Sequence, residues 1–326
     1  MNITVFEVSP DEQQELDLLA RTLPVTLRLS EKPLSLETLS LAEGAEGIST
    51  LGLSRLDRVM FGKLRELGVQ YLSTRTIGFD HVDLAAAREC GIRVSHAAYP
   101  PAAVADFTIM LMLLVLRRYK PAMWRQNVND YSLKGLMGRS LHSLTVGVVG
   151  TGSIGSTVIR SLSGFGCRIL AYNLTDCEEL HPYASFVDLD TLYRESDVIT
   201  FHVPATPETV HMVNKESLAR MKDGVVLINT ARGELMDIDA ITEGVETKKI
   251  GSLAMDVFEH EKGIYHTDRK TDIIKNKDMV YLRQFPNVVL TQHMAFYTEE
   301  SIVSMVDCGI RGLLDMKEGR KTRLEL

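Results

Sequence analysis

The sequence predicts an α/β protein made of two doubly wound domains, each a parallel sheet covered by helices. Its 326 residues exceed what one hydrophobic core usually organises, which favours two domains. Short apolar runs alternate with amphipathic stretches in two separate series, and a glycine-rich turn follows the first strand of the second series. Such alternation is typical of parallel sheets, because each crossover between parallel strands needs a long connecting element.

The first series occupies the first hundred residues of the chain. Residues 3–7, 69–73 and 92–95 are short apolar runs that predict strands, and the amphipathic stretches 55–67 and 82–89 predict helices. We therefore expect one α/β domain in this part of the chain.

The second series begins near Leu144. Five apolar runs separated by helical stretches predict strands at residues 146–149, 168–172, 198–201, 225–229 and 253–256. A long apolar stretch from about Pro101 to Arg118 lies between the two series and predicts a buried helix. Its most apolar part is only ten residues long, well short of the ~20 that span a bilayer, so we expect no membrane partner.

The chain is expected to return to its first domain at its C-terminal end. The segment after Tyr297 is amphipathic and predicts a helix through Ile302, Met305, Val306, Ile310 and Leu313. We therefore assign residues 1–99, completed by 299–326, to one domain and residues 100–298 to the other.

Composition and charge argue for small-molecule chemistry. Hydrophobic residues make up 45% of the chain, the formal net charge is −7, and no block of lysine or arginine is present, so no nucleic acid partner is expected. The cysteines lack the close spacing of a metal or redox site, and no signal peptide is recognisable, which fits a cytoplasmic location. We expect no metal, because His202 and His211 stand far from other candidate ligands.

The glycine-rich turn lies where a dinucleotide-binding turn should lie. Gly150, Gly152 and Gly155 form a G-x-G-x-x-G pattern between an apolar strand and a helical stretch from Ser156 to Phe165. In such a turn the first glycine permits the tight bend, the second lets the backbone approach a pyrophosphate, and the third allows close helix packing. The alternative is a merely tight strand-to-helix turn, but the strand, helix and spacing together favour a Rossmann domain.

The ribose position departs from the usual NAD pattern. Asn173 ends the second strand of this series, where NAD-binding domains commonly carry Asp or Glu. The next six residues contain Asp176, Glu178 and Glu179 but no arginine that would bind a 2′-phosphate. The sequence therefore favours NAD over NADP.

Three further segments complete a recognisable set of motifs: Asn229-Thr-Ala-Arg232-Gly233, Ala254-Met-Asp256-Val-Phe-Glu-His-Glu261 and Thr291-Gln-His293-Met-Ala-Phe-Tyr297. With them the chain resembles the D-isomer-specific 2-hydroxyacid dehydrogenases over nearly its whole length, and among these most closely the D-lactate dehydrogenases, including those of glycopeptide resistance. The resemblance implies a flavodoxin-like substrate domain beside the Rossmann domain. It also implies NAD-dependent reduction of a 2-oxo acid, pyruvate or a larger analogue, to the D-2-hydroxy acid.

The chemistry of that reaction calls for three kinds of protein group. A cation must bind the substrate carboxylate, and the planar fork of Arg232 suits this while polarising the carbonyl. A proton must reach the developing alkoxide, and His293, which follows a strand end, is the expected donor. Glu261 is expected to orient that imidazole and favour its protonated form. Each of these residues also has an ordinary structural explanation, but their joint occurrence behind a dinucleotide turn favours catalysis.

The resemblance also implies the lining of the two binding sites. The cofactor-binding residues are expected to be Gly150, Gly152, Ser153, Ile154, Gly155, Asn173, Val203, Pro204, Thr209, Thr230, Ala231, Arg232 and Asp256, with Asp256 near the nicotinamide. The substrate-binding residues are expected to be Leu51, Ile77, Gly78, Tyr99, Arg232 and Phe296, with the backbone of Ile77 and Gly78 receiving the carboxylate. For the cofactor residues, ordinary packing at strand ends is the alternative explanation.

Two positions depart from the family pattern. Gln292 stands where the family often has proline before the histidine, and Leu51 stands where many D-lactate enzymes have tyrosine. The shorter Leu51 leaves open a preference for larger branched-chain or aromatic 2-oxo acids, which would use the same machinery. An NAD-binding corepressor of the same fold is the alternative of another class, against which the compact chain without long extensions argues.

A homodimer is expected from the resemblance and from one segment. Residues 119–143 leave the pattern of the second domain and carry the large apolar side chains of Trp124, Tyr131, Leu133, Leu136 and Met137. Such side chains commonly bury against a partner subunit. The alternative is a segment that packs within its own chain.

Overall fold

The computed structural model describes all of residues 1–326 and divides them into two compact units. The first unit comprises Met1–Pro100 and Tyr297–Leu326, and the second comprises Pro101–Phe296. The sequence assigned residues 100, 297 and 298 to the second domain. The structure assigns them to the first unit, where the Tyr297 hydroxyl donates a hydrogen bond to Asp11. No helix in the structure combines the length and the apolarity needed to cross a bilayer.

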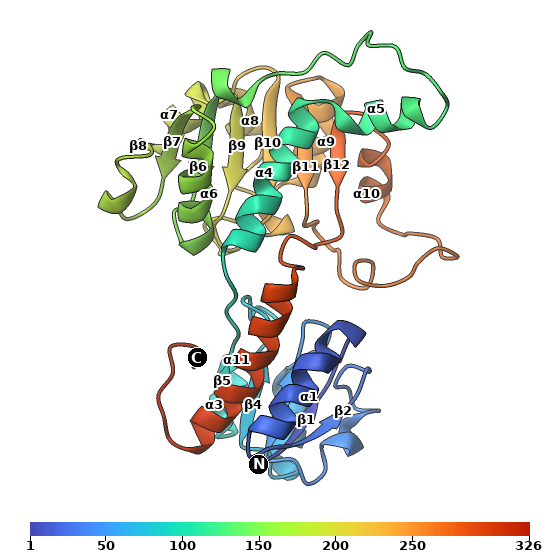
Figure 1. The fold of residues 1–326 in the computed structure, drawn as a ribbon, viewed down its shortest axis with the longest axis vertical. Coiled ribbons are helices and arrows are strands. Elements are labelled where there is room, and N and C mark those ends of the chain that lie inside the picture. The colour runs from blue at the N-terminus through green and yellow to red at the C-terminus, as the bar shows by residue number, and fades with distance from the viewer. The chain divides into compact units, whose positions relative to one another are not determined.

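The first unit is built on a parallel sheet of five strands in the order β2-β1-β3-β4-β5, which is the flavodoxin-like order (Figure 1). Its strands are β1 (Asn2–Val5), β2 (Thr26–Leu29), β3 (Gly47–Thr50), β4 (Tyr71–Thr74) and β5 (Arg93–Ser95). The covering helices are α1 (Gln13–Thr22), α2 (Arg58–Glu66), α3 (Leu84–Glu89) and α11 (Glu299–Lys317), with the short turn η1 (Pro10–Glu12) before α1.

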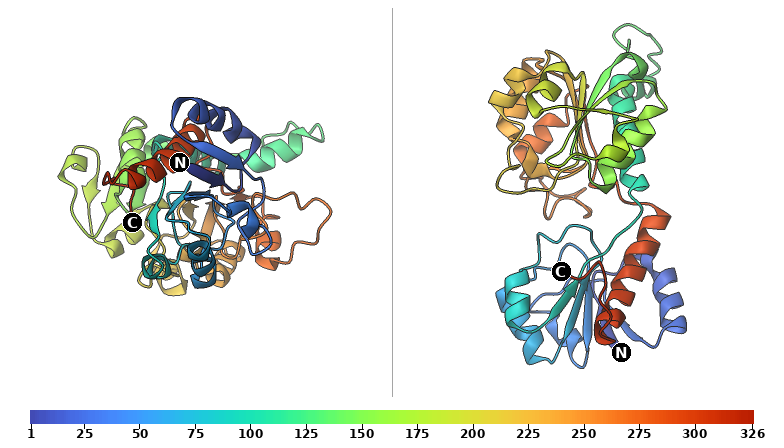
Figure 2. Two further views of the ribbon diagram at one scale, coloured as in Figure 1. Left: turned by 90° about the horizontal axis from the view of Figure 1, so that it is seen from below. Right: turned by 90° about the vertical axis from the view of Figure 1, so that its left-hand side faces the viewer.

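Alternate residues of these strands serve two separate cores. Ile3 and Val5 pack with α1 and α11, whereas Ile48 and Leu72 pack with α2 and α3. These two groups of helices cover opposite faces of the sheet (Figure 2). α11 is the helix that the amphipathic pattern after Tyr297 predicted, and it completes the first of these cores with Val306, Ile310 and Leu313. The C-terminal segment of the chain is therefore an integral part of the first unit.

Two strands of this sheet lack the apolar run from which a strand is predicted. β3 reads Gly-Ile-Ser-Thr, and its Ser49 and Thr50 are fully buried, so polar side chains stand where the pattern requires apolar ones. β2 lies at the edge of the sheet with most of its residues exposed, and it has little apolar signal. The three strands that were predicted, residues 3–7, 69–73 and 92–95, correspond to β1, β4 and β5 with shifted ends.

The second unit contains a parallel sheet of seven strands in the order β12-β11-β10-β9-β6-β7-β8. Its strands are β6 (Thr145–Val149), β7 (Arg168–Tyr172), β8 (Ser185–Phe186), β9 (Val198–Phe201), β10 (Val225–Asn229), β11 (Ile250–Met255) and β12 (Val288–Leu290). The order is that of a Rossmann domain extended by one strand. The short β8 and β12 were not predicted, because two or three residues cannot form a periodic signal.

Helices cover both faces of this sheet as well. α4 (Ala102–Leu116) and α6 (Ser153–Ser163) share one core with alternate residues of β6 and β7. The opposite core contains α7 (Leu189–Glu195), α8 (Lys215–Arg220), α9 (Ile238–Glu246) and α10 (Lys277–Leu282). A shorter helix, α5 (Tyr119–Gln126), follows α4. β6 lies at the point where the strand order reverses, with β7 on one side and β9 on the other, and sheets of this type bind ligands at the carboxyl ends of such strands.

The turn between β6 and α6 is closed by a contact that only glycine permits. A Cβ atom added to Gly155 would collide with the backbone carbonyl of Gly150. α6 can therefore start directly at the end of β6 only because residue 155 has no side chain.

Gly155→Ala should destabilise the second unit, because the added methyl group has no room beside the Gly150 carbonyl. We expect a loss of ~1–3 kcal/mol in the free energy of unfolding, the usual effect of overpacking. Gly152→Ala is the matched control in the same turn, since a Cβ atom there meets no atom within 4 Å. Urea unfolding followed by circular dichroism measures both variants, and an equal loss in the two contradicts this account.

Candidate active site

The glycine turn presents an open backbone at the end of β6. Gly150 has a φ of 92°, in the left-handed region, and a Cβ atom on it would lie 2.6 Å from the carbonyl oxygen of His202. Gly152 is exposed, has open space where a side chain would stand, and is the N-cap of α6 without any side chain to cap the helix. Nothing within the protein requires glycine at position 152, whereas a phosphate approaching the backbone and the helix N-terminus does.

A polar atom of the same turn also lacks a partner. The Thr151 hydroxyl is buried and makes no hydrogen bond. A buried hydroxyl without a partner is costly unless another molecule binds it. The open face at Gly152 and this hydroxyl therefore fit a bound dinucleotide.

Asn173 follows the end of β7 and is tied to its neighbours. Its side-chain oxygen accepts a hydrogen bond of 3.4 Å from the Thr151 amide, and its side-chain nitrogen donates to the Thr175 carbonyl at 2.9 Å. This amide therefore links the glycine turn to the segment that contains Asp176, Glu178 and Glu179.

Threonine hydroxyls form hydrogen bonds in the segments that follow β9 and β10. The Thr209 hydroxyl donates to the Pro204 carbonyl at 2.6 Å and closes the turn that follows Val203. Thr230 is buried, and its hydroxyl contacts that of Thr108 on α4 at 2.8 Å. Both segments follow the carboxyl ends of their strands, β9 beside β6 and β10 beside β9, on the edge of the sheet that carries the glycine turn.

Arg232 lies just after β10 and is half-buried. One nitrogen of its guanidinium donates to the Ala231 carbonyl at 2.8 Å. The following residue, Gly233, packs so closely on the backbone of Phe258 and Glu259 that a Cβ atom would collide with it. This contact brings the segment of Arg232 against the segment that leads to Glu261.

Glu261 and His293 form a hydrogen-bonded pair at the centre of the candidate site. Glu261 Oε1 bonds His293 Nδ1, and Glu261 Oε2 accepts from the Phe258 amide at 2.6 Å, so both carboxylate oxygens are in use. The side chain of His293 remains 33% exposed, so the imidazole is not fully covered within the chain. Burial lowers the pKa of His202 to about 3 and keeps that imidazole neutral.

Asp256 holds the segment that carries His293. The carboxylate is fully buried and accepts hydrogen bonds from the Thr291 hydroxyl at 2.6 Å, from the Met294 amide at 2.9 Å and from the Ala295 amide at 2.8 Å. The His293 amide donates to the Asp256 carbonyl at 2.7 Å. These bonds stabilise His293 in the left-handed region, at a φ of 55°, which a non-glycine residue seldom adopts.

Sequence reasoning missed a second histidine in this place. His266 Nε2 contacts the carbonyl oxygen of His293 at 2.9 Å, and the rings of His266, His293 and Phe296 approach one another with centroids 5.9 to 6.4 Å apart. The anchoring contacts of Asp256 were also missed, since the family pattern suggested only a position near the cofactor. No local signal marks either contact, because each joins residues 27 or more positions apart.

The residues expected to bind substrate from the first unit gather at one edge of its sheet. Leu51 follows β3, Ile77 and Gly78 follow β4, and Tyr99 follows β5, and all four are half-buried. The amides of Ile77 and Gly78 donate no hydrogen bond within the chain. Two free amides on adjacent residues suit an anion such as a carboxylate. The other two residues expected to bind substrate, Arg232 and Phe296, belong to the second unit.

Comparison with known proteins agrees with this geometry. The family model for the NAD-binding domain of D-isomer-specific 2-hydroxyacid dehydrogenases matches residues 109–295. An aromatic 2-oxoacid reductase of Clostridium sporogenes is 39% identical over 319 residues, which cover 97% of this chain and 96% of that protein. The D-lactate dehydrogenase of Escherichia coli is 35% identical, with all of both chains covered.

A solved structure extends the likeness to three dimensions. The D-isomer-specific 2-hydroxyacid dehydrogenase of Lactobacillus delbrueckii ssp. bulgaricus, determined with NAD bound, superposes with a TM-score of 0.86 at 29% identity and full coverage of both chains. The match of the family model and the similarity of whole chains agree with the glycine turn and with the expected fold of both units. The chain therefore belongs to the D-isomer-specific 2-hydroxyacid dehydrogenases and is an NAD-dependent oxidoreductase.

Proposed function

We propose that this protein reduces 2-oxo acids to D-2-hydroxy acids, with Arg232, Glu261 and His293 as its catalytic residues. The contact between the Glu261 carboxylate and Nδ1 of His293 is the observation that carries the proposal. Because Nδ1 of His293 is bound to the carboxylate, Nε2 is the atom that gives its proton to the carbonyl oxygen of the substrate. Arg232 binds the substrate carboxylate and polarises the carbonyl. NADH, when bound, supplies the hydride.

The cofactor is assigned to the carboxyl edge of the seven-stranded sheet. Gly150, Gly152, Ser153, Ile154 and Gly155 would hold the pyrophosphate, and Asn173 would hold the adenosine ribose. The remaining contacts are assigned to residues after β9, β10 and β11, namely Val203, Pro204, Thr209, Thr230, Ala231, Arg232 and Asp256. The acidic segment after Asn173 supports NAD over NADP, because it repels a 2′-phosphate.

Glu261→Gln should lower the pH at which 2-oxo acid reduction is lost, by about one unit or more. An uncharged amide stabilises the imidazolium of His293 less than a carboxylate does, so the proton required for reduction leaves at lower pH. The measurement is the pH profile of kcat/KM. Glu259→Gln is the control, because the Glu259 carboxylate contacts His211 instead of His293. A profile that moves equally in both variants, or in neither, removes Glu261 from this role.

For the substrate, we propose 2-oxo acids with side chains larger than methyl. Leu51 stands where many D-lactate enzymes have tyrosine, and it widens the proposed pocket and makes it more apolar. The similarity to an aromatic 2-oxoacid reductase supports this choice. Pyruvate is the second candidate, supported by the similarity to a D-lactate dehydrogenase along the whole chain.

Leu51→Tyr should shift the preference toward pyruvate by one to two orders of magnitude, since each methylene in an apolar pocket contributes ~1–3 kcal/mol. The measurement compares kcat/KM for pyruvate, 2-oxoisocaproate and phenylpyruvate in the native protein and the variant. Leu53→Tyr is the control, because Leu53 lies two positions away and is 42% exposed. A native preference for pyruvate that the Leu51 substitution leaves unchanged contradicts the proposed pocket wall.

We also propose a homodimer that uses residues 119–143. Within this segment Tyr131, Leu133 and Met137 are 73%, 82% and 87% exposed, although they are large and apolar. Trp124 is 47% exposed, and Leu136 is half-buried. Side chains of this kind are seldom left in water together, and a second copy of the chain would cover them.

Light scattering at micromolar concentration should report about twice the chain mass of 36.4 kDa. Leu133→Lys should shift the population toward monomer, because a charge would then enter the apolar interface. Leu174→Lys is the control, since Leu174 is 92% exposed and lies outside the segment. A monomeric native protein would refute the dimer.

We further propose that the protein works in the reducing cytoplasm. All four cysteines are free thiols in the structure, which suits a compartment that keeps thiols reduced. Cell fractionation tests this, and recovery of the protein from another compartment contradicts it.

A further inference from the structure

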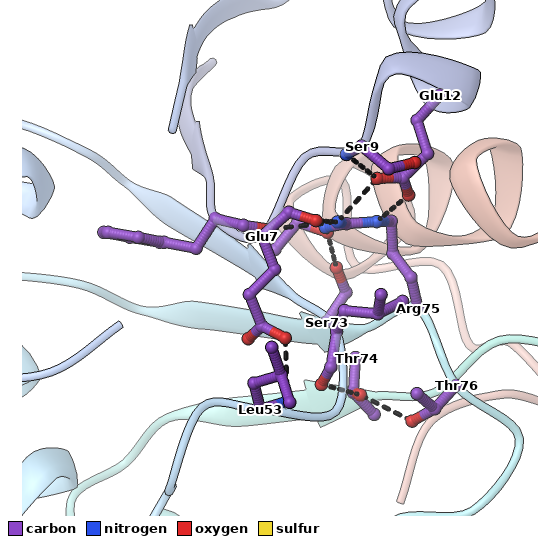
Figure 3. A network of polar contacts seen from close by, with 11 residues as sticks. Glu7, Ser9, Glu12, Leu53, Ser73, Thr74, Arg75 and Thr76 are labelled. Carbon is purple, nitrogen blue, oxygen red and sulfur yellow. Dashed lines mark hydrogen bonds and ion pairs between the residues drawn. The ribbon is translucent and has the colours of Figure 1, made fainter. Parts of the chain in front are cut away.

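An unusual concentration of buried charge lies beneath the proposed substrate loops of the first unit (Figure 3). Arg75 is the largest fully buried side chain, and Glu12 and Glu7 are 2% and 5% exposed. Arg75 is bound to Glu12 through two nitrogens, at 2.7 and 3.2 Å, and its other bonds reach the Ser49 hydroxyl and the carbonyls of Phe6 and Glu7. The charge of the guanidinium is therefore balanced by Glu12, and the Glu7 carboxylate has a different partner.

That partner is the loop after β3. The Glu7 carboxylate accepts hydrogen bonds from the Leu53 amide at 2.7 Å, from the Ser54 amide at 2.9 Å and from the Ser54 hydroxyl. The Glu7 carbonyl accepts from Arg75 at 3.3 Å. Glu7 thus connects the Arg75–Glu12 pair with residues 51–54, which begin with the proposed pocket residue Leu51.

Further polar contacts link the loop 51–54 to residues 76–78, which contain the proposed substrate residues Ile77 and Gly78. The Thr74 hydroxyl lies 3.3 Å from the Leu51 carbonyl and 2.7 Å from the Thr76 hydroxyl, which donates to the Gly78 carbonyl at 2.6 Å. Arg75 stands between these two threonines in the chain. Glu7 therefore holds the loop 51–54, and the Thr74 hydroxyl connects that loop at Leu51 with the loop 76–78 at Thr76.

Stability alone does not account for this arrangement. Buried charges are costly to desolvate, and apolar residues of similar volume often stabilise a fold as well or better. Glu7 is also strained, with a backbone φ of 59° in the left-handed region. What a buried carboxylate provides is a rigid acceptor that holds two loop amides in a single geometry.

We infer that Glu7 is a positioning residue for the 2-oxo acid: it fixes residues 51–54 and, through Thr74 and Thr76, the amides of Ile77 and Gly78 that receive the substrate carboxylate. The inference rests on the proposed function of these loops. Glu7 itself touches no substrate. Its effect is on substrate binding, and the nucleotide site, which belongs to the other unit, is independent of it.

The test is Glu7→Gln, which keeps the volume but replaces one carboxylate oxygen by a donor facing an N–H group. KM for the 2-oxo acid should rise roughly tenfold or more, the usual consequence of losing a hydrogen bond to a buried charge. The affinity for NADH, measured by quenching of protein fluorescence, should stay within about twofold. A merely structural defect would instead lower the unfolding temperature and the active fraction without changing KM.

Glu325→Gln is the matched control. It breaks another carboxylate–arginine pair of the same unit, where Glu325 Oε1 lies 2.7 Å from Arg93 Nε, outside this network. It should leave KM for the 2-oxo acid unchanged even where it lowers stability. If Glu7→Gln does not fold, Ser54→Ala removes one of the donors to Glu7 and should raise the same KM by a few fold.

The outcomes separate this inference from the proposed function. If the native protein reduces 2-oxo acids but KM stays unchanged in both Glu7→Gln and Ser54→Ala, Glu7 has no positioning role and the proposed function stands. An equal rise of KM in Glu325→Gln also overturns the inference, because the loss of any carboxylate–arginine pair in the unit would then raise KM for the 2-oxo acid. A native protein that binds NADH but reduces no 2-oxo acid overturns the proposed function and this inference with it.

Discussion

Parallel strand pairing is the constraint on which the rest of this structure depends. Every strand in both sheets runs parallel to its neighbours, so all carboxyl ends of a sheet lie along a single edge. Segments far apart in sequence, such as the glycine turn after β6 and the histidine segment after β12, are thereby brought to the same edge. The crossover helices cover both faces of the sheets, which leaves that edge as the place where polar groups can gather without desolvating the core.

In both units a buried carboxylate fixes an irregular loop by accepting hydrogen bonds from it. In the second unit the buried Asp256 carboxylate accepts from two loop amides and a hydroxyl and so fixes the segment of His293. In the first unit Glu7 accepts from two amides and a hydroxyl of the loop after β3. A carboxylate is suited to this, because its two oxygens can accept several bonds at once and each is strengthened by the charge. In both cases one residue of the arrangement, His293 or Glu7, has a left-handed backbone that the hydrogen bonds stabilise.

Close contacts with the backbone of neighbouring segments explain why glycine is needed at positions 155 and 233 of the second unit. Gly155 allows α6 to begin beside the carbonyl of Gly150, and Gly233 allows the segment of Arg232 to lie against that of Phe258 and Glu259. Gly152 differs from both, because no atom of the protein occupies the space beside it. The first two glycines thus shape the protein, and the third leaves room for a ligand.

The sequence by itself determined the class of fold and the glycine turn, because both depend on local periodicity or on a short motif. Its other motifs pointed to Glu261 and His293, which the structure pairs, and to Arg232, whose catalytic role stays a prediction. The sequence did not determine β3, whose Ser49 and Thr50 are buried polar residues that hydrophobic periodicity cannot detect. Nor did it reveal the contacts of Asp256 with the histidine segment or of Arg75 with Glu12, which join residues 38 and 63 positions apart. Only the tertiary structure decided these, because a buried polar group gains its partner from whichever segment the fold places beside it, and local sequence carries no record of that neighbour.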